Sequence, residues 1–267
     1  VNTSGESYVA WQWLNDSLST SANTDGNISS TVLANTTSGF SVLTYSGNGS
    51  DNQTIGHGLG IAPKMIWTKR LNATGGWTAY HDAVGINKVF YLNSTSAPVS
   101  NTEQYRAVPT SSVYTVGVGG DINNSSGTYV AYVFAEVDGF SKIGSYTGNG
   151  STDGPFIYTG FKPRFVIIKR YTAVESWPIL DTARGSGNFG SPAGSGGDNP
   201  TAGNDLNAVL VASNTAAEED NPGGSRKASY VSNGFKVRTT NTAMNASGSG
   251  YIYMAFAESP FKTTTAR

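Results

Sequence analysis

The sequence contains an internal repeat with a period of about 100 residues. Four blocks of the first half return in the same order in the second half, with matching glycine, aromatic and branched positions. The matching pairs are Gly39–Ser50 with Gly139–Ser151, Pro63–Arg70 with Pro163–Arg170, Trp77 with Trp177, and Tyr129–Glu136 with Tyr251–Glu258. Because self-similarity at a fixed period reports a repeated structural unit, the chain is expected to hold two tandem copies of one fold.

The repeat sets the expected domain boundaries. Residues 39–138 form the first repeat, residues 139–262 form the second, and residues 263–267 are a C-terminal tail. The second copy is longer because of an insertion at 185–204, where Gly, Ser, Pro and Asn dominate. No apolar period survives in this insertion, so we predict an exposed loop.

Residues 1–38 precede the first repeat and are expected to form an orphan strand followed by a hairpin. Tyr8–Trp13 resembles the closing block of each repeat, but the unit that it would close is missing. Either the chain is cut from a longer array, or this strand completes a sheet in the first unit or in a neighbouring subunit. Asp25-Gly26 predicts the turn of the hairpin. The start at Val1 rather than Met indicates either that residues have been removed or that the register begins inside a longer product.

The residue pattern predicts β-structure. Tyr129–Phe134 and Tyr251–Phe256 are apolar at nearly every position, as expected of central strands covered on both faces. Met65–Trp67 and Phe165–Ile168 have the same character, and Ser, Asn and Gly turns separate them from shorter strands. We therefore expect an all-β fold of two tandem antiparallel β-sandwich units, jelly-roll or lectin-like, with an extra N-terminal strand.

Composition excludes several classes of partner and chemistry. Only 13% of the residues are charged and the net charge is -1, so no basic field is available for nucleic acid. No apolar run approaches the roughly 20 residues of a membrane span, so no membrane insertion is expected. The chain has no cysteine, which excludes disulfides, thiolate metal sites and cysteine nucleophiles.

The residues that could support catalysis are few. Neither His57 nor His81 belongs to a nucleophile, metalloprotease or paired-carboxylate pattern. His57 lies in a glycine-rich turn whose second copy, near Tyr158, has no histidine, which favours a structural hydrogen bond. The loop at 148–154 superficially resembles a cation site, but too few carboxylates cluster there, so turn chemistry is preferred. We expect no enzyme, no metal and no cofactor.

Aromatic residues beside loops are the candidate ligand contacts. Exposed rings at such places could stack on sugar faces, with His81 beside them, whereas the alternative role is packing within the fold. Retention of the ring in both copies at the Trp77 and Trp177 position favours packing. The candidate set is Trp77, Tyr80, His81, Tyr171 and Trp177.

Three stretches carry a resemblance to a known family. They are the Tyr-Val-Ala-Tyr-Val-Phe-Ala-Glu run that opens 129–142, Gly-Ser-Tyr-Thr-Gly-Asn-Gly at 144–150, and Gly-Phe-Lys-Pro-Arg-Phe-Val-Ile-Ile-Lys-Arg at 160–170. Together they resemble an uncharacterised β-sandwich repeat family of structural proteins in marine tailed bacteriophages. The family often has Cys in the closing strand, whereas Gln12, Val133 and Ala255 stand here.

The resemblance covers nearly the whole chain and implies a structural protein on the virion surface, in a tail fibre or a capsid decoration, with no catalytic residues to carry over. The implied partners are other virion proteins and copies of the chain itself, with a homotrimer as the first arrangement to test. A glycan-binding adhesin that contacts the host surface is the alternative. A tailspike-like glycan hydrolase needs two converging acids, and the sequence identifies no such pair.

Overall fold

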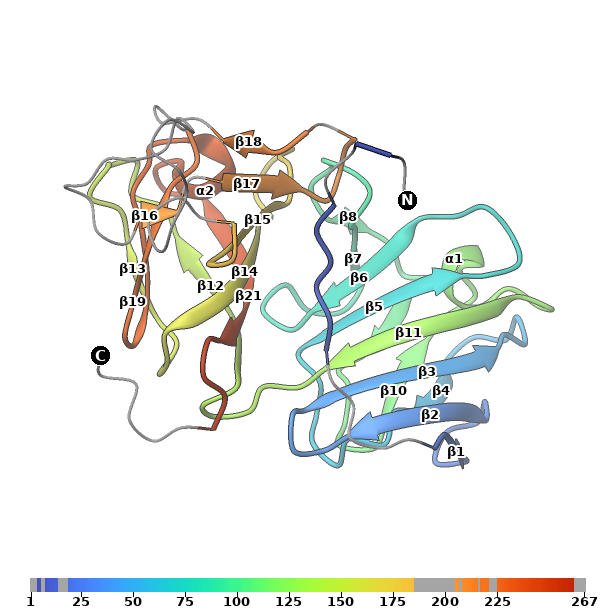
Figure 1. The fold of residues 1–267 in the computed structure, drawn as a ribbon. Coiled ribbons are helices and arrows are strands. Elements are labelled where there is room, and N and C mark those ends of the chain that lie inside the picture. The colour runs from blue at the N-terminus through green and yellow to red at the C-terminus, as the bar shows by residue number, and fades with distance from the viewer. Residues whose placement is uncertain are drawn as a thin grey trace.

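The computed structural model describes residues 4–5, 8–13, 19–184, 205–206, 208–215, 217–220 and 225–261. The chain forms two units, each made of one large and one small antiparallel sheet packed face to face as a sandwich (Figure 1). The predicted all-β sandwich class is confirmed. The predicted loop at 185–204 and tail at 263–267 lie outside the described residues.

The first unit has an eight-stranded sheet over a three-stranded sheet, with one short helix, α1 (Gly120–Asn123). The large sheet has the order β1 (Ser21–Asn23), β2 (Ser30–Asn35), β3 (Phe40–Ser46), β11 (Thr128–Phe134), β5 (Met65–Arg70), β6 (Trp77–His81), β7 (Lys88–Tyr91) and β8 (Val99–Ser100). The small sheet has the order β4 (Gln53–Gly56), β10 (Val113–Val116) and β9 (Tyr105–Ala107).

The second unit has a six-stranded sheet over a four-stranded sheet, with the short helix α2 (Thr242–Asn245). The large sheet has the order β12 (Ser141–Thr147), β21 (Gly250–Ala257), β14 (Pro163–Arg170), β15 (Pro178–Asp181), β17 (Ala208–Val211) and β18 (Glu219–Asp220). The small sheet has the order β13 (Phe156–Tyr158), β20 (Gly234–Val237), β19 (Ala228–Val231) and β16 (Asp205–Leu206).

The repeated blocks occupy equivalent strands in the two large sheets. The strand order β3-β11-β5-β6-β7 of the first unit recurs as β12-β21-β14-β15-β17 in the second. The register recurs as well, since Tyr129 lies opposite Tyr45 and Tyr251 lies opposite Tyr146. All residues of β21 are buried, as its continuous apolar sequence predicts for a central strand covered on both faces.

The N-terminal region differs from the expectation in two ways. Residues 8–13 form no strand, so the extra N-terminal strand predicted there is absent from the described residues. The first unit also begins before Gly39, because β1 and β2 form a hairpin around residues 24–29 and β2 pairs along β3. The rings of Trp11 and Trp13 pack against the two units instead of joining a sheet.

A buried asparagine holds the glycine-asparagine-glycine loop in each unit. In the first unit the Asn123 side chain at the end of α1 reaches three backbone groups, and Asn245 of α2 makes the same contacts in the second. The first set is Asn48 N (2.9 Å), Ser50 O (2.8 Å) and Gly117 O (2.9 Å), and the second is Asn149 N (2.8 Å), Ser151 O (2.7 Å) and Thr239 O (2.8 Å). The loop residues thus serve turn chemistry, as expected.

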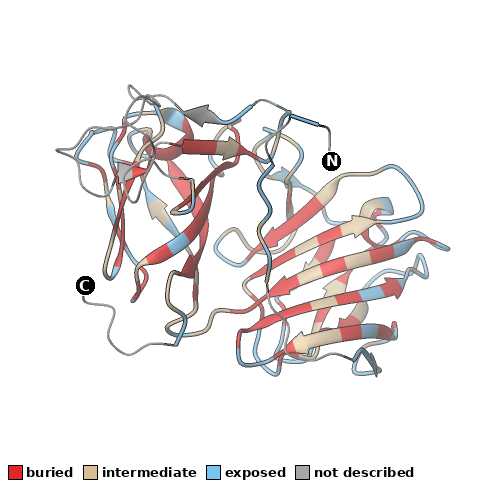
Figure 2. Ribbon diagram, in the orientation of Figure 1, coloured by how far each residue is buried: buried red, intermediate tan, exposed pale blue. Residues whose placement is uncertain are grey.

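The two units share a hydrophobic core in addition to their own. Each sandwich has an internal apolar cluster, and a third cluster contains buried residues of both large sheets. Figure 2 shows the buried residues running through the large sheets of both units. The members of the shared cluster include Phe40, Met65, Phe90 and Phe134 from the first unit and Ile167, Trp177, Met254 and Phe256 from the second.

Candidate functional site

An extended segment lies between the two units and fills part of the space between their large sheets (Figure 1). We call residues 8–13 the N-terminal strap. The ring of Trp13 contacts Phe40 and Phe134 of the first unit at centroid distances of 6.2 and 6.0 Å. It also contacts Phe165 and Phe256 of the second unit at 5.9 and 5.4 Å. One side chain therefore bridges both units.

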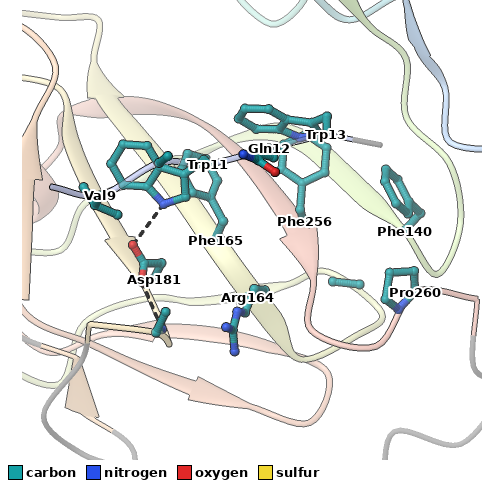
Figure 3. Close-up of a pocket in the computed structure, with 13 residues that line it drawn as sticks. Val9, Trp11, Gln12, Trp13, Phe140, Arg164, Phe165, Asp181, Phe256 and Pro260 are labelled. Carbon is teal, nitrogen blue, oxygen red and sulfur yellow. Dashed lines mark hydrogen bonds between the residues drawn. The ribbon is translucent and has the colours of Figure 1, made fainter. Parts of the chain in front are cut away.

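Trp11 fixes the strap to the second unit through polar and aromatic contacts (Figure 3). Its Nε1 donates a hydrogen bond of 3.0 Å to Oδ2 of Asp181, and its ring lies edge-on to Phe165. The guanidinium of Arg184 lies 5.4 Å from the ring centroid and donates to the same carboxylate at 2.7 Å. Because Asp181 is almost fully buried, its charge is paired within this cluster.

Two hollows flank the strap. The first has a volume of about 350 Å³ and is drawn in Figure 3. The second has a volume of about 560 Å³ and lies against the first unit, where Trp67, Trp77 and Tyr132 line it together with the strap. These three rings are half-buried, and Trp77 stacks on Tyr132 at 6.1 Å. Half-exposed rings of this kind can stack on the apolar face of a sugar or on another apolar group.

Comparison with known proteins gives a family. Residues 1–260 match a family described as a domain of unknown function (DUF7483). The chain belongs to this family. The matched range includes both units and the strap of this DUF7483 protein. No curated protein and no solved structure matches the chain.

Trp77 and Trp177 occupy equivalent positions of the repeat but have different environments in the structure. In this DUF7483 protein Trp77 lines the larger hollow, but Trp177 is 1% exposed and lies between the units. Its ring packs edge-on against Phe90, and its Nε1 donates to Tyr91 O at 3.1 Å. The Trp177 ring therefore has no face free for a ligand, whereas Trp77 does.

The other candidate contacts are divided between core and interface. Tyr80 is fully buried in the core of the first unit, where burial raises the pKa of its hydroxyl. Tyr171 is half-buried and packs against the cluster that the two units share. His81 is buried, and its Nε2 lies 3.4 Å from Tyr253 O of the second unit. Of the five candidates, Trp77 lines one of the two hollows beside the strap, and the other four line neither.

Both histidines replace oxygen acceptors that stand at the equivalent positions of the other unit. Nδ1 of His81 accepts the Ala83 N–H at 3.2 Å, as Oδ1 of Asp181 accepts the Ala183 N–H at 2.9 Å. Similarly, Nδ1 of His57 accepts a backbone N–H two residues on, as Oγ1 of Thr159 does. The proton of each ring is therefore on Nε2, and both rings serve turn structure, as expected for His57.

A buried lysine joins the two units beside Trp177. Lys169 is fully buried, and its Nζ donates to Thr95 O of the first unit at 2.8 Å and to Glu175 O. The ammonium also lies 5.8 Å from the Trp177 ring centroid. Burial lowers the pKa of Lys169 to about 8, because the backbone acceptors replace only part of its hydration.

Two aromatic residues of the larger hollow, Trp67 and Tyr132, were not predicted as ligand contacts from the sequence, although a comparison of the repeats contains a signal. Trp67 pairs with Tyr132 on the face that meets the strap. At the equivalent positions of the second unit, Ile167 pairs with Met254. An aromatic pair in one copy and an aliphatic pair in the other marks a face whose environment has diverged. Within the described residues, no group of three or more His, Cys, Asp or Glu side chains could hold a metal ion, and no helix is long and apolar enough to cross a membrane.

Proposed function

We propose that this chain is a non-enzymatic structural protein on the surface or an appendage of a tailed bacteriophage virion, where it provides assembly and display surfaces. The observation that carries the proposal is the apolar cluster shared by the two units. Domains joined by small polar contacts move relative to one another, whereas a large apolar contact holds them as one body. A spacer in a particle needs this rigidity.

Polar contacts support the same role. Glu175 N donates to Thr95 O at 2.8 Å, and Lys169 reaches the same carbonyl oxygen from a second direction. Trp177 donates to Tyr91 O nearby. These bonds fix the orientation that the apolar cluster alone leaves adjustable, because hydrogen bonds are directional. The low charge of the chain suits a particle surface that resists nonspecific adhesion.

The test is to locate the chain on intact particles. An antibody raised against the purified protein is applied to intact virions of the bacteriophage that encodes the chain, and the bound antibody is visualised by electron microscopy. Label on the exterior of unbroken particles, at regular positions, is the expected result. Label that appears only after particles are disrupted, or none while the chain is found in the infected cells, would contradict the proposal. Light scattering on the purified protein tests the expected homotrimer.

A glycan-binding adhesin is the second candidate, favoured by the larger hollow. Trp67, Trp77 and Tyr132 present half-buried rings there, and aromatic rings beside an open cavity suit the apolar face of a pyranose. The ligand would be a host surface glycan bound without chemical change.

The two tryptophans provide a matched pair of variants for this candidate. Binding of the protein to a glycan array and to host envelope polysaccharide should be saturable, and Trp77→Ala should abolish it. Trp177→Phe should leave it unchanged, because the Trp177 ring is 1% exposed. Absence of saturable binding by the wild-type protein, or equal loss in both variants, would reject the adhesin.

A further inference from the structure

The chain covers one edge of the first sandwich with its own N-terminal hairpin. β2 pairs along β3, and residues of the hairpin also reach the edge of the small sheet. Ile28 N donates to Thr54 O at 3.0 Å, and Ser30 Oγ donates to Gly56 O at 2.8 Å. The outward backbone acceptors of β4 are therefore satisfied by a polypeptide segment, which shows what kind of group fits this edge.

The second unit has no such cover among the described residues. β12 and β13 are the outermost strands on the equivalent side of its two sheets. Ile157 lies opposite Phe235 as Ile55 lies opposite Tyr114, so Phe156 and Tyr158 take the places of Thr54 and Gly56. Among the described residues, nothing covers in the second unit the edge that the hairpin covers in the first.

The backbone of β13 turns its unused groups outward. Val237 N donates to Pro155 O, and Thr159 N donates to Asn233 O, so the odd-numbered residues bond to β20. Alternation along an antiparallel strand then directs the N–H and C=O of Phe156 and Tyr158 away from the sheet. No described residue forms a hydrogen bond with these four groups.

The side chains of the same two residues are unusually exposed for aromatic groups. Phe156 is 47% exposed and Tyr158 is 63% exposed, on a strand that faces away from the first unit (Figure 1). Proteins normally protect an edge strand with charges, proline or a covering segment. An edge that combines free backbone groups with two exposed rings is suited to pair with another strand.

We propose that β13 pairs antiparallel with β13 of a second copy, about a two-fold axis at Ile157. Phe156 then lies opposite the partner's Tyr158, and Tyr158 lies opposite the partner's Phe156. Both pairs are of the hydrogen-bonded type, so four backbone hydrogen bonds form and each Phe ring meets a Tyr ring on one face. The two four-stranded sheets become one continuous sheet.

The sequence of the strand itself identifies the occupant as a second copy. The outward N–H and C=O groups belong to Phe156 and Tyr158, on either side of Ile157. A two-fold rotation about Ile157 places the donors of one copy opposite the acceptors of the other, as an isologous contact requires. The strand has only 3 residues, so we expect a weak dimer that forms at micromolar concentrations. This inference does not depend on the virion assignment, because a two-fold contact between β13 strands can join two monomers or two larger assemblies of the chain.

The first test measures self-association by sedimentation equilibrium up to about 200 µM. The mass of the wild type should rise reversibly with concentration toward twice its value in dilute solution. A variant with both Phe156→Lys and Tyr158→Lys should associate in this way at least tenfold more weakly, because like charges would face each other. The control carries Val108→Lys and Val174→Lys, at positions 60% and 67% exposed, and should dimerise as the wild type does. Wild-type protein with no association, or equal dimerisation of all three proteins, would overturn the proposal.

The second test determines which residues of the two β13 strands lie opposite each other, and it introduces no charge. The chain has no cysteine, so Phe156→Cys and Tyr158→Cys each introduce a single thiol. Opposite residues of a hydrogen-bonded pair have Cα atoms about 5.5 Å apart, within disulfide range. A mixture of the two variants should therefore form disulfide-linked dimers faster than either variant alone. Equal rates in all three samples, with circular dichroism showing folded protein, would refute this pairing.

Discussion

Replacement of His81 by Asn should make the protein less sensitive to acid. His81 is 2% exposed, and burial lowers the pKa of its ring from 6.5 to about 4. Between these values the unfolded chain binds more protons than the folded protein, so stability falls as the pH drops from 6.5 toward 4. With these two pKa values the loss amounts to about 2.5 kcal/mol between pH 7.5 and pH 4.5.

Asn is the informative substitution because the equivalent position of the second unit holds Asp181, whose Oδ1 accepts the same kind of turn N–H. The Asn oxygen can accept from Ala83 as the ring nitrogen does, and it does not titrate. Urea denaturation of both proteins, followed by tryptophan fluorescence, gives the free energy of unfolding at each pH.

The difference between wild type and variant should shift by about 2.5 kcal/mol in favour of the variant on going from pH 7.5 to pH 4.5. Comparing the two proteins at each pH cancels the contributions that the other carboxyl and histidine groups make to the pH dependence of the free energy of unfolding. The His57→Thr variant, which copies the residue at the equivalent position Thr159, should change the acid sensitivity in the same direction, since burial also lowers the pKa of His57. A difference that stays constant within about 0.5 kcal/mol would refute the burial argument for His81.

Three further predictions concern the unit interface, the strap and the loops. Burial holds the pKa of Lys169 at about 8, below its usual 10.5. The free energy of unfolding of the wild type should therefore rise by about 1 kcal/mol between pH 7 and pH 9. Urea denaturation of Lys169→Met should not show this rise. Trp13→Ala removes a ring that touches phenylalanines of both units, and should lower the free energy of unfolding by about 2 kcal/mol; an unchanged urea midpoint would show that the strap contributes nothing to stability. Asn123→Ala and Asn245→Ala should each lower the free energy of unfolding, measured by calorimetry, by roughly 2 to 4 kcal/mol, because each leaves several buried backbone groups unpaired. Unequal losses would mean that the two loops are not held by equivalent contacts.

The repeat made the centre of the fold predictable. A continuous apolar run such as Tyr251–Phe256 suits only a strand covered on both faces, and the structure buries all of it. The aligned blocks then placed this strand between the same neighbours in both units. The strap was not predictable in the same way, because Tyr8–Trp13 has the sequence of a strand. Apart from Phe40, the residues that contact Trp11 and Trp13 through rings or hydrogen bonds lie more than 100 positions away.

The candidate site was predicted only in part. Alignment of Trp77 with Trp177 implied one role for both, yet one lines a hollow and the other is buried between the units. The reason is that the equivalent strands of the two large sheets have different surroundings. Trp177, immediately before β15, and Ile179 within it belong to the apolar cluster shared by the two units, whereas Trp77, at the start of β6, lines the larger hollow. Sequence pattern reports which face of a strand is apolar, but not which apolar face another unit will cover.

The position of the strap also determines when the native contacts can form during synthesis. Residues 8–13 are synthesised before both units, whereas Asp181 is made 170 residues after Trp11, and Phe256 belongs to β21 of the second unit. Trp11 therefore cannot make its native contacts until the second unit has folded, whereas Trp13 can already pack on Phe40 and Phe134 of the first unit. A nascent chain that ends before the second unit therefore leaves Trp11 without its native partners, Phe165 and Asp181.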